Sequence, residues 1–131
     1  MFEVTVRDHI SSAHQLHGYD GPCKDMHGHT WKVEMIVGGD SLDEVGLLAD
    51  FKVLKALLKQ VLMPLDHVVH NNVPAFKDIN PSTENLARHI YRDLSAHCAP
   101  LRLKHVQVWE SDTASVIYYE YESCYFIIRR T

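Results

Sequence analysis

The feature that most constrains the fold is an alternating run at residues 30–37, directly after a His-Gly-His motif. Apolar and polar side chains alternate through TWKVEMIV, which is typical of a β-strand because side chains repeat every second residue. A strand that begins near the first histidine places five side chains on one face: His27, His29, Trp31, Val33 and Met35. A chain built on this strand carries two imidazoles at one end of an apolar sheet face.

This pair of imidazoles is half of a metal site, and His14 is the candidate for a third ligand. His14 ends the preceding alternating run, residues 2–14, which predicts an adjacent strand. Three neutral nitrogen ligands would leave one tetrahedral position open, as in a catalytic zinc site. Cys23 could instead be a fourth ligand that closes a structural site, or a nucleophile or base beside an open one. The spacing leaves both alternatives open.

Two helices are predicted in the middle of the chain. Residues 49–63 carry an apolar stripe at helical spacing, with Asp50 as the N-cap and Pro64 as the stop. A second helix is expected to begin with Asn80 as its cap and Pro81 at its first position.

Residues 103–110 and 115–121 predict two more strands, so the element order is strand, strand, helix, helix, strand, strand. This order indicates an α+β fold, ββααββ, in which two helices cover one face of a four-stranded antiparallel sheet. The length predicts one domain spanning residues 1–131. We interpret Trp31 and its apolar neighbours as lying on the face that the helices leave open, which would favour self-association.

Charge and composition argue against several classes of protein. A formal net charge of −4 provides no basic surface for nucleic acid. No apolar run reaches the length of a membrane span, and the N-terminal residues alternate as a strand does rather than forming a signal peptide. The three widely spaced cysteines make no disulfide framework, so a cytoplasmic location is expected.

Five short motifs together resemble the 6-pyruvoyl-tetrahydropterin synthase family. They are SAHQL at 12–16, CKDMHGH at 23–29, LDH at 65–67, PSTEN at 81–85 and WES at 109–111, in the family's order. The three-residue gap between Cys23 and His27 resembles the branch that makes 6-carboxy-tetrahydropterin for queuosine synthesis. The resemblance implies the tunnelling fold, in which the sheets of several protomers join as a barrel. It also implies a homohexamer of two stacked trimers, with active sites between protomers.

The resemblance further implies a role for each motif residue. The implied zinc ligands are His14, His27 and His29. The implied catalytic thiolate is Cys23, and Asp66 and His67 are its implied proton-handling partners. Glu110 is implied to anchor the pterin ring, with Thr83 near it. The chemistry suits these roles, because a carboxylate can accept two hydrogen bonds from the aminopyrimidine edge of a pterin.

The implied activity is a zinc-dependent lyase reaction on a pterin triphosphate. It converts 7,8-dihydroneopterin triphosphate to 6-carboxy-5,6,7,8-tetrahydropterin and releases acetaldehyde and triphosphate. Two alternatives stay open. The same residues could form 6-pyruvoyl-tetrahydropterin, or the chain could be a non-catalytic oligomeric pterin-binding module whose structural zinc is closed by Cys23.

Overall fold

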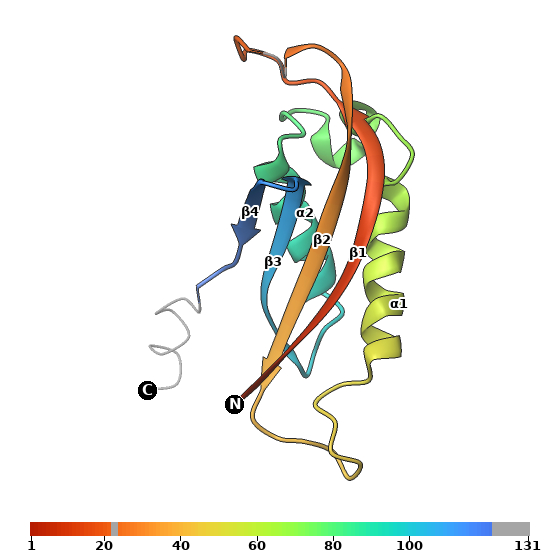
Figure 1. The fold of residues 1–131 in the computed structure, drawn as a ribbon, viewed down its shortest axis with the longest axis vertical. Coiled ribbons are helices and arrows are strands. Elements are labelled where there is room, and N and C mark those ends of the chain that lie inside the picture. The colour runs from red at the N-terminus through yellow and green to blue at the C-terminus, as the bar shows by residue number, and fades with distance from the viewer. Residues whose placement is uncertain (22–23, 122–131) are drawn as a thin grey trace.

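A four-stranded antiparallel sheet and two helices make up the fold (Figure 1). The computed structural model describes residues 1–21 and 24–121. The strands are β1 (Phe2–His14), β2 (His27–Gly39), β3 (Arg102–Ser111) and β4 (Ala114–Tyr118), side by side in that order. The main helices are α1 (Phe51–Leu62) and α2 (Thr83–Ser95), and between them lie the short 3₁₀ helices η2 (Met63–Leu65), η3 (His70–Asn72) and η4 (Pro74–Phe76).

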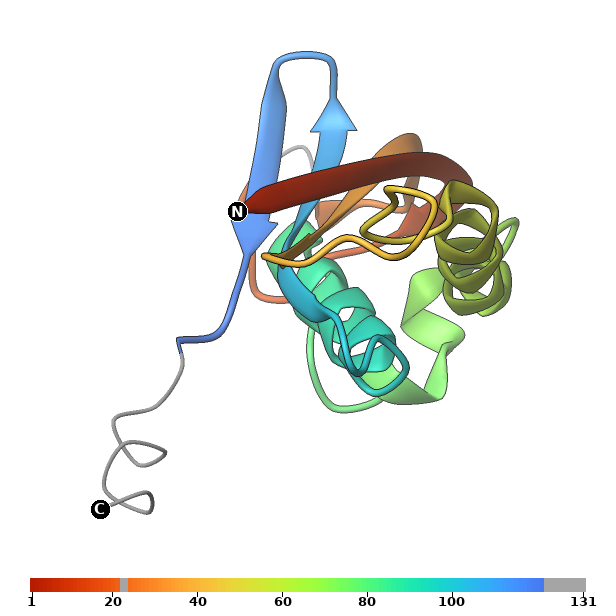
Figure 2. The ribbon, with the colours of Figure 1, turned by 90° about the horizontal axis from the view of Figure 1, so that it is seen from below.

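Both helices lie on the same side of the sheet, as two perpendicular views show (Figure 1, Figure 2). The predicted α+β order, ββααββ, is therefore confirmed. The joining of such sheets into a barrel by oligomerisation remains a prediction. Within the described residues, no helix is both long enough and apolar enough to span a membrane.

The core fills the space between the helices and one face of the sheet. Leu58 of α1 and Ile90 of α2 are fully buried there, and so are Trp31, Val33 and Met35 of β2. The prediction that these three β2 residues lie on the uncovered face is therefore wrong. Alternation shows that they share a face, but it does not show which face the helices cover.

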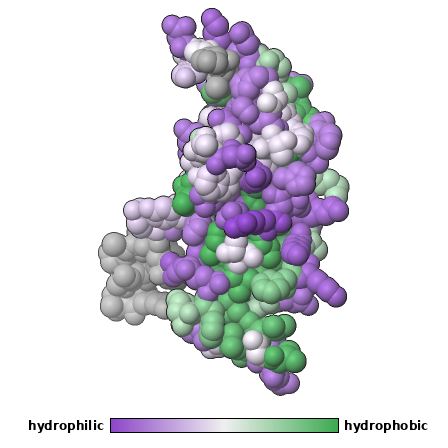
Figure 3. Space-filling view, viewed as in Figure 1, coloured by the Kyte–Doolittle hydropathy of each residue, from purple (hydrophilic) through white to green (hydrophobic). Residues whose placement is uncertain are grey.

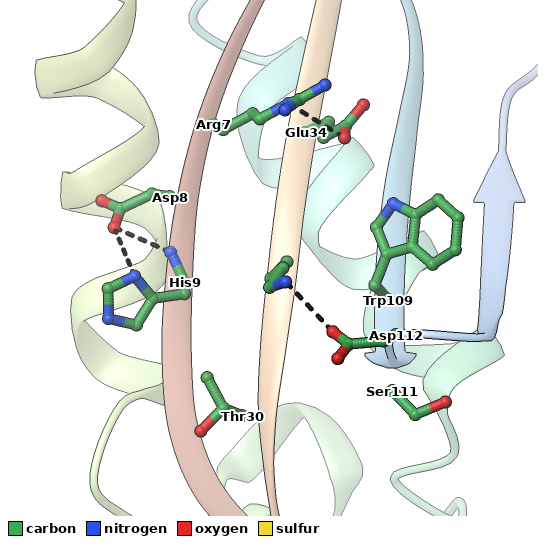
Figure 4. Close-up of a pocket in the computed structure, with 9 residues that line it drawn as sticks. Arg7, Asp8, His9, Thr30, Glu34, Trp109, Ser111 and Asp112 are labelled. Carbon is green, nitrogen blue, oxygen red and sulfur yellow. Dashed lines mark hydrogen bonds and ion pairs between the residues drawn. The ribbon is translucent and has the colours of Figure 1, made fainter.

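The open face of the sheet is mostly polar. Figure 3 shows hydrophilic side chains over the upper part of this face and apolar ones gathered toward its lower end. Arg7 on β1 pairs with Glu34 on β2 at 3.0 Å, and Lys32 pairs with Asp112 at 3.1 Å (Figure 4). A cavity of about 720 Å³ lies over these pairs, with Trp109 in its wall. The main charges around this cavity therefore neutralise each other in pairs.

The N-terminal caps of the two helices agree only in part with those predicted from the sequence. The Asp50 carboxylate accepts a hydrogen bond (2.8 Å) from an amide in the first turn of α1, as predicted for its N-cap. At α2, the Ser82 hydroxyl accepts a hydrogen bond (3.1 Å) from the Asn85 amide, so Ser82 is the N-cap and the assignment to Asn80 is wrong. The side chain of Asn80 binds the backbone of the β1–β2 connection instead.

We expect Leu58→Ala to lower the free energy of unfolding by about 2–5 kcal/mol, because it removes a buried side chain and leaves a cavity. Val53→Ala on the same helix is the matched control, since Val53 is 63% exposed, and its effect should stay within about 0.5 kcal/mol. Urea unfolding at one fixed protein concentration measures both. Equal effects of the two substitutions would contradict this description of the core.

Candidate metal and substrate site

The pairing of β1 with β2 brings two of the predicted ligands together. The two strands pair in continuous register from Phe2↔Gly39 to His14↔His27, so the last pair places the two histidines directly opposite each other. Their Nε2 atoms are 3.0 Å apart. His29 follows on the same face of β2, and one ligand atom from each of the three imidazoles lies within 4.8 Å of the others. The three residues could therefore hold one metal ion.

Backbone carbonyls fix the protonation of two of these rings. The Nδ1–H of His14 donates to the carbonyl of Pro81 at 2.7 Å, and the Nδ1–H of His27 donates to the carbonyl of Asp25 at 2.6 Å. A carbonyl oxygen can only accept, so the proton of each ring is on Nδ1. In a neutral imidazole, Nε2 then carries a free lone pair, which is the form that binds a metal.

The resulting arrangement favours a cation. Two Nε2 lone pairs at 3.0 Å repel each other unless a positive charge lies close to both. The Nε2 of His29 is also buried, and it has no hydrogen-bond partner in the part of the chain that the structure describes. Burial lowers the pKa of His14 and of His29, which keeps both rings neutral. Three neutral imidazole nitrogens suit zinc among the divalent cations.

Glu110 borders the histidine cluster and is held by a hydrogen-bonded chain. Its Oε1 lies 3.7 Å from Nε2 of His14 and 3.6 Å from Nε2 of His29. The Thr83 hydroxyl donates to the same oxygen at 3.1 Å, and the indole N–H of Trp31 donates to the Thr83 hydroxyl at 3.2 Å. Because the indole can only donate, it directs the Thr83 proton toward the carboxylate. The structure thus places Thr83 beside Glu110, and the substrate-binding role of the two residues stays a prediction.

A cavity of about 400 Å³ opens beside Glu110 and Thr83. This volume is within the usual range for small-molecule sites. Its lining combines polar groups with apolar side chains: Leu16, Tyr19, Ser82, Thr83, Glu84, Glu110, Ala114, Ser115 and Val116. The carboxylate can therefore bind a ligand with hydrogen-bond donors along one edge.

Asp66 and His67 form a pair of their own beside the edge strand β1. Their side chains meet at 2.9 Å, and the carboxylate of Asp66 also accepts from the amide of Ser11 at 2.8 Å. That backbone hydrogen bond lowers the pKa of Asp66. The His67 side chain is 81% exposed. Among the described residues, no hydrogen bond or ion pair joins this pair to the three histidines or to Glu110.

The remaining predicted residue, Cys23, lies outside the described residues. The sequence alone did not reveal the indole N–H of Trp31 or the carbonyls of Asp25 and Pro81 as parts of the site. A backbone acceptor carries no side-chain signature, and the alternating pattern indicates only that Trp31 is an apolar strand residue. The available signal for Pro81 was its place in the PSTEN motif, next to Thr83.

Comparisons with known proteins indicate a single family. The family model described as 6-pyruvoyl tetrahydropterin synthase matches residues 3–121. A 6-carboxy-5,6,7,8-tetrahydropterin synthase of Bacillus subtilis is 35% identical, over 89% of this chain and 84% of the relative. A 6-pyruvoyl tetrahydrobiopterin synthase of Poecilia reticulata is 32% identical, over 88% of each chain. The solved structure of Caenorhabditis elegans 6-pyruvoyl tetrahydropterin synthase superposes with a TM-score of 0.80 at 26% identity, covering 92% of this chain and 98% of that one.

We expect His29→Ala to abolish tight binding of a divalent cation, because two imidazoles alone make a weak site. His9→Ala is the matched control, since the His9 side chain is 68% exposed and lies apart from the cluster on the open face of the sheet. Equilibrium dialysis against Zn²⁺, followed by elemental analysis, measures the metal content per chain. Equal metal content in the two variants would contradict the three-histidine site.

A buried histidine beneath the site, His70, should make stability depend on pH. Its ring lies 4.9 Å from that of Trp31, its Nε2–H donates to the carbonyl of Leu65 at 2.8 Å, and burial lowers its pKa. Below about pH 6.5 the unfolded chain therefore takes up a proton that the folded state does not, so stability falls as pH falls. His70→Gln keeps an N–H donor but cannot be protonated.

Metal-free His70→Gln should accordingly lose less stability than the metal-free wild type when pH is lowered from about 7.5 to about 5.5. The free energy of unfolding at the two pH values measures this difference. The same pH dependence in both proteins would show that His70 does not contribute to it.

Proposed function

The chain belongs to the 6-pyruvoyl tetrahydropterin synthase family, and from this premise we propose that it is a zinc-dependent pterin lyase. The proposed reaction converts 7,8-dihydroneopterin triphosphate and one water to 6-carboxy-5,6,7,8-tetrahydropterin, acetaldehyde and triphosphate, in queuosine synthesis. The observation that carries the proposal is the convergence of three imidazole nitrogens beside a carboxylate at the edge of a cavity. A free, buried thiol at Cys98 fits a reducing cytoplasm.

In this proposal, His14, His27 and His29 hold the zinc through their Nε2 atoms. The tautomers of His14 and His27 suit the role, because the carbonyls of Pro81 and Asp25 keep the protons on the opposite nitrogens. When bound, zinc supplies Lewis acidity that lowers the pKa of the substrate's side-chain hydroxyls.

Glu110 is proposed to orient the substrate. Its carboxylate can accept hydrogen bonds from the amino group and ring N–H of a pterin, which gives direction to binding in a partly apolar cavity. The hydrogen bond from Thr83 keeps the carboxylate in place before substrate arrives, so less of the binding energy is used to order it. Trp31 supports this contact from the core side.

Cys23, Asp66 and His67 are proposed to move protons during the rearrangement. A Cys23 thiolate beside a positively charged group would have a pKa below its ordinary value of about 8.5. The contact between Asp66 and His67 lets the carboxylate orient the imidazole as a general acid or base. The exposure of His67 beside an edge strand supports an active site that is completed between protomers.

The two open edges of the sheet also favour an assembly of the kind that the resemblance implies. Both β1 and β4 are edge strands of an open sheet, and unpaired edges are templates for pairing with another chain. We propose that copies of the chain pair at these edges into a barrel and form a hexamer of two trimers. The mostly polar open face of the sheet would then face the interior of the barrel.

The second candidate is formation of 6-pyruvoyl-tetrahydropterin by the same residues. Its support is that relatives carrying that name are nearly as similar to this chain as those named for the carboxy product. The three-residue gap between Cys23 and His27 favours the carboxy reaction. The two activities differ in whether the three-carbon side chain is cleaved.

Anaerobic incubation of zinc-loaded protein with 7,8-dihydroneopterin triphosphate tests the proposal. Mass spectrometry of the pterin product and an assay for acetaldehyde should reveal 6-carboxy-5,6,7,8-tetrahydropterin with acetaldehyde. A pyruvoyl product without acetaldehyde would favour the second candidate. Folded, zinc-replete protein with no turnover would contradict both.

We expect Cys23→Ala to keep zinc and the fold but to lose turnover by at least about a hundredfold, as removal of an acid–base group does. Zinc content, thermal unfolding and product formation are measured on the same preparation. Loss of zinc together with unfolding would instead favour a closed structural site, and with it the non-catalytic binding module.

A further inference from the structure

The backbone that leaves β1 after His14 is held by two asparagine side chains. Asn71 accepts from the Gln15 amide and donates to the Gln15 carbonyl, both at 2.8 Å. Asn80 accepts from the His17 amide and donates to the His17 carbonyl, again both at 2.8 Å. Each side-chain amide therefore satisfies both backbone groups of one residue, as a neighbouring strand would. We call these two contacts the asparagine clamps.

The clamps hold the residues on either side of Leu16. Leu16 lies in the wall of the 400 Å³ cavity that contains Glu110, and Tyr19, two residues after the second clamp, lies in the same wall. A loop held only by its two ends would let this wall move, because ordering each loop residue costs backbone conformational entropy. The clamps meet that cost before any ligand binds.

The second clamp is connected to the rest of the site. The carbonyl of Asn80 accepts from the side-chain amide of Asn85 at 2.8 Å, which ties the clamp to the first turn of α2. The next residue, Pro81, binds the Nδ1–H of His14, and Thr83 binds Glu110. The cavity wall, a metal ligand and the carboxylate are thus positioned by one short stretch of chain.

We propose that Asn71 and Asn80 are positioning residues for substrate binding, which hold Leu16 and Tyr19 as the apolar wall against which a pterin ring packs. This inference rests on the proposed function, because it assumes that the cavity beside Glu110 binds a pterin. Neither asparagine is expected to contact the reacting atoms. Their effect should therefore appear in binding, with the chemical step unchanged.

The test compares Asn71→Ala and Asn80→Ala with Asn72→Ala in the zinc-loaded, full-length protein. Asn72 is the matched control, because it is exposed in η3 and, among the described residues, its side chain makes no hydrogen bond. Fluorescence titration with neopterin should give a Kd raised about tenfold by each clamp substitution, as the loss of two hydrogen bonds implies, and unchanged by the control. The KM for 7,8-dihydroneopterin triphosphate should rise with it, while kcat and zinc content stay close to wild type.

Amide hydrogen exchange shows whether each clamp was broken, because the amides of Gln15 and His17 should exchange faster in their respective variants. Faster exchange with an unchanged Kd for neopterin would overturn the inference. Lowered kcat or zinc content at an unchanged Kd would also overturn it. Wild-type protein that does not bind neopterin would contradict the proposed function itself, whereas normal wild-type binding with unaffected variants would remove only this inference.

Discussion

The site depends on two imidazole lone pairs that are held 3.0 Å apart. Continuous pairing of β1 with β2 sets His14 opposite His27, and two backbone carbonyls then prevent either ring from turning its N–H toward the other. Such an arrangement is unfavourable without a cation between the rings, since a bound ion relieves both the repulsion and the missing hydrogen bonds. The positions and tautomers of the His14 and His27 rings therefore favour binding of a cation, which adds a physical reason to the metal site that the sequence predicts.

The start of α2 organises what surrounds the cluster of His14, His27 and His29. The residues from Asn80 to Thr83 bind, in turn, the β1–β2 connection, the His14 ring, the helix's own first turn and Glu110. A helix start is well suited to this task, because its backbone and side-chain groups are not all used within the helix. This turn therefore links His14 to Glu110 through only a few residues of chain.

Alternation and helical stripes predicted the strands, the helices and the shared face of the three histidines, because these periods follow directly from backbone geometry. The side of the sheet that Trp31 faces could not be predicted, since alternation shows which side chains share a face but not which face the helices cover. The prediction of Asn80 as the N-cap of α2 is wrong because Asn80 and Ser82 are both good N-caps. The choice between them depends on a tertiary contact of Asn80 that the sequence does not show. The carbonyl of Pro81 could not be foreseen, since every residue has one.

In the proposed site, three histidine nitrogens bind zinc and leave one position open for substrate. X-ray absorption at the zinc edge of the metal-loaded, full-length protein tests it most directly. We expect three nitrogen ligands at about 2.0–2.1 Å, with an oxygen in the remaining position and no sulfur. A sulfur ligand at about 2.3 Å that disappears in Cys23→Ala would contradict it, because the site would then be closed by that thiolate.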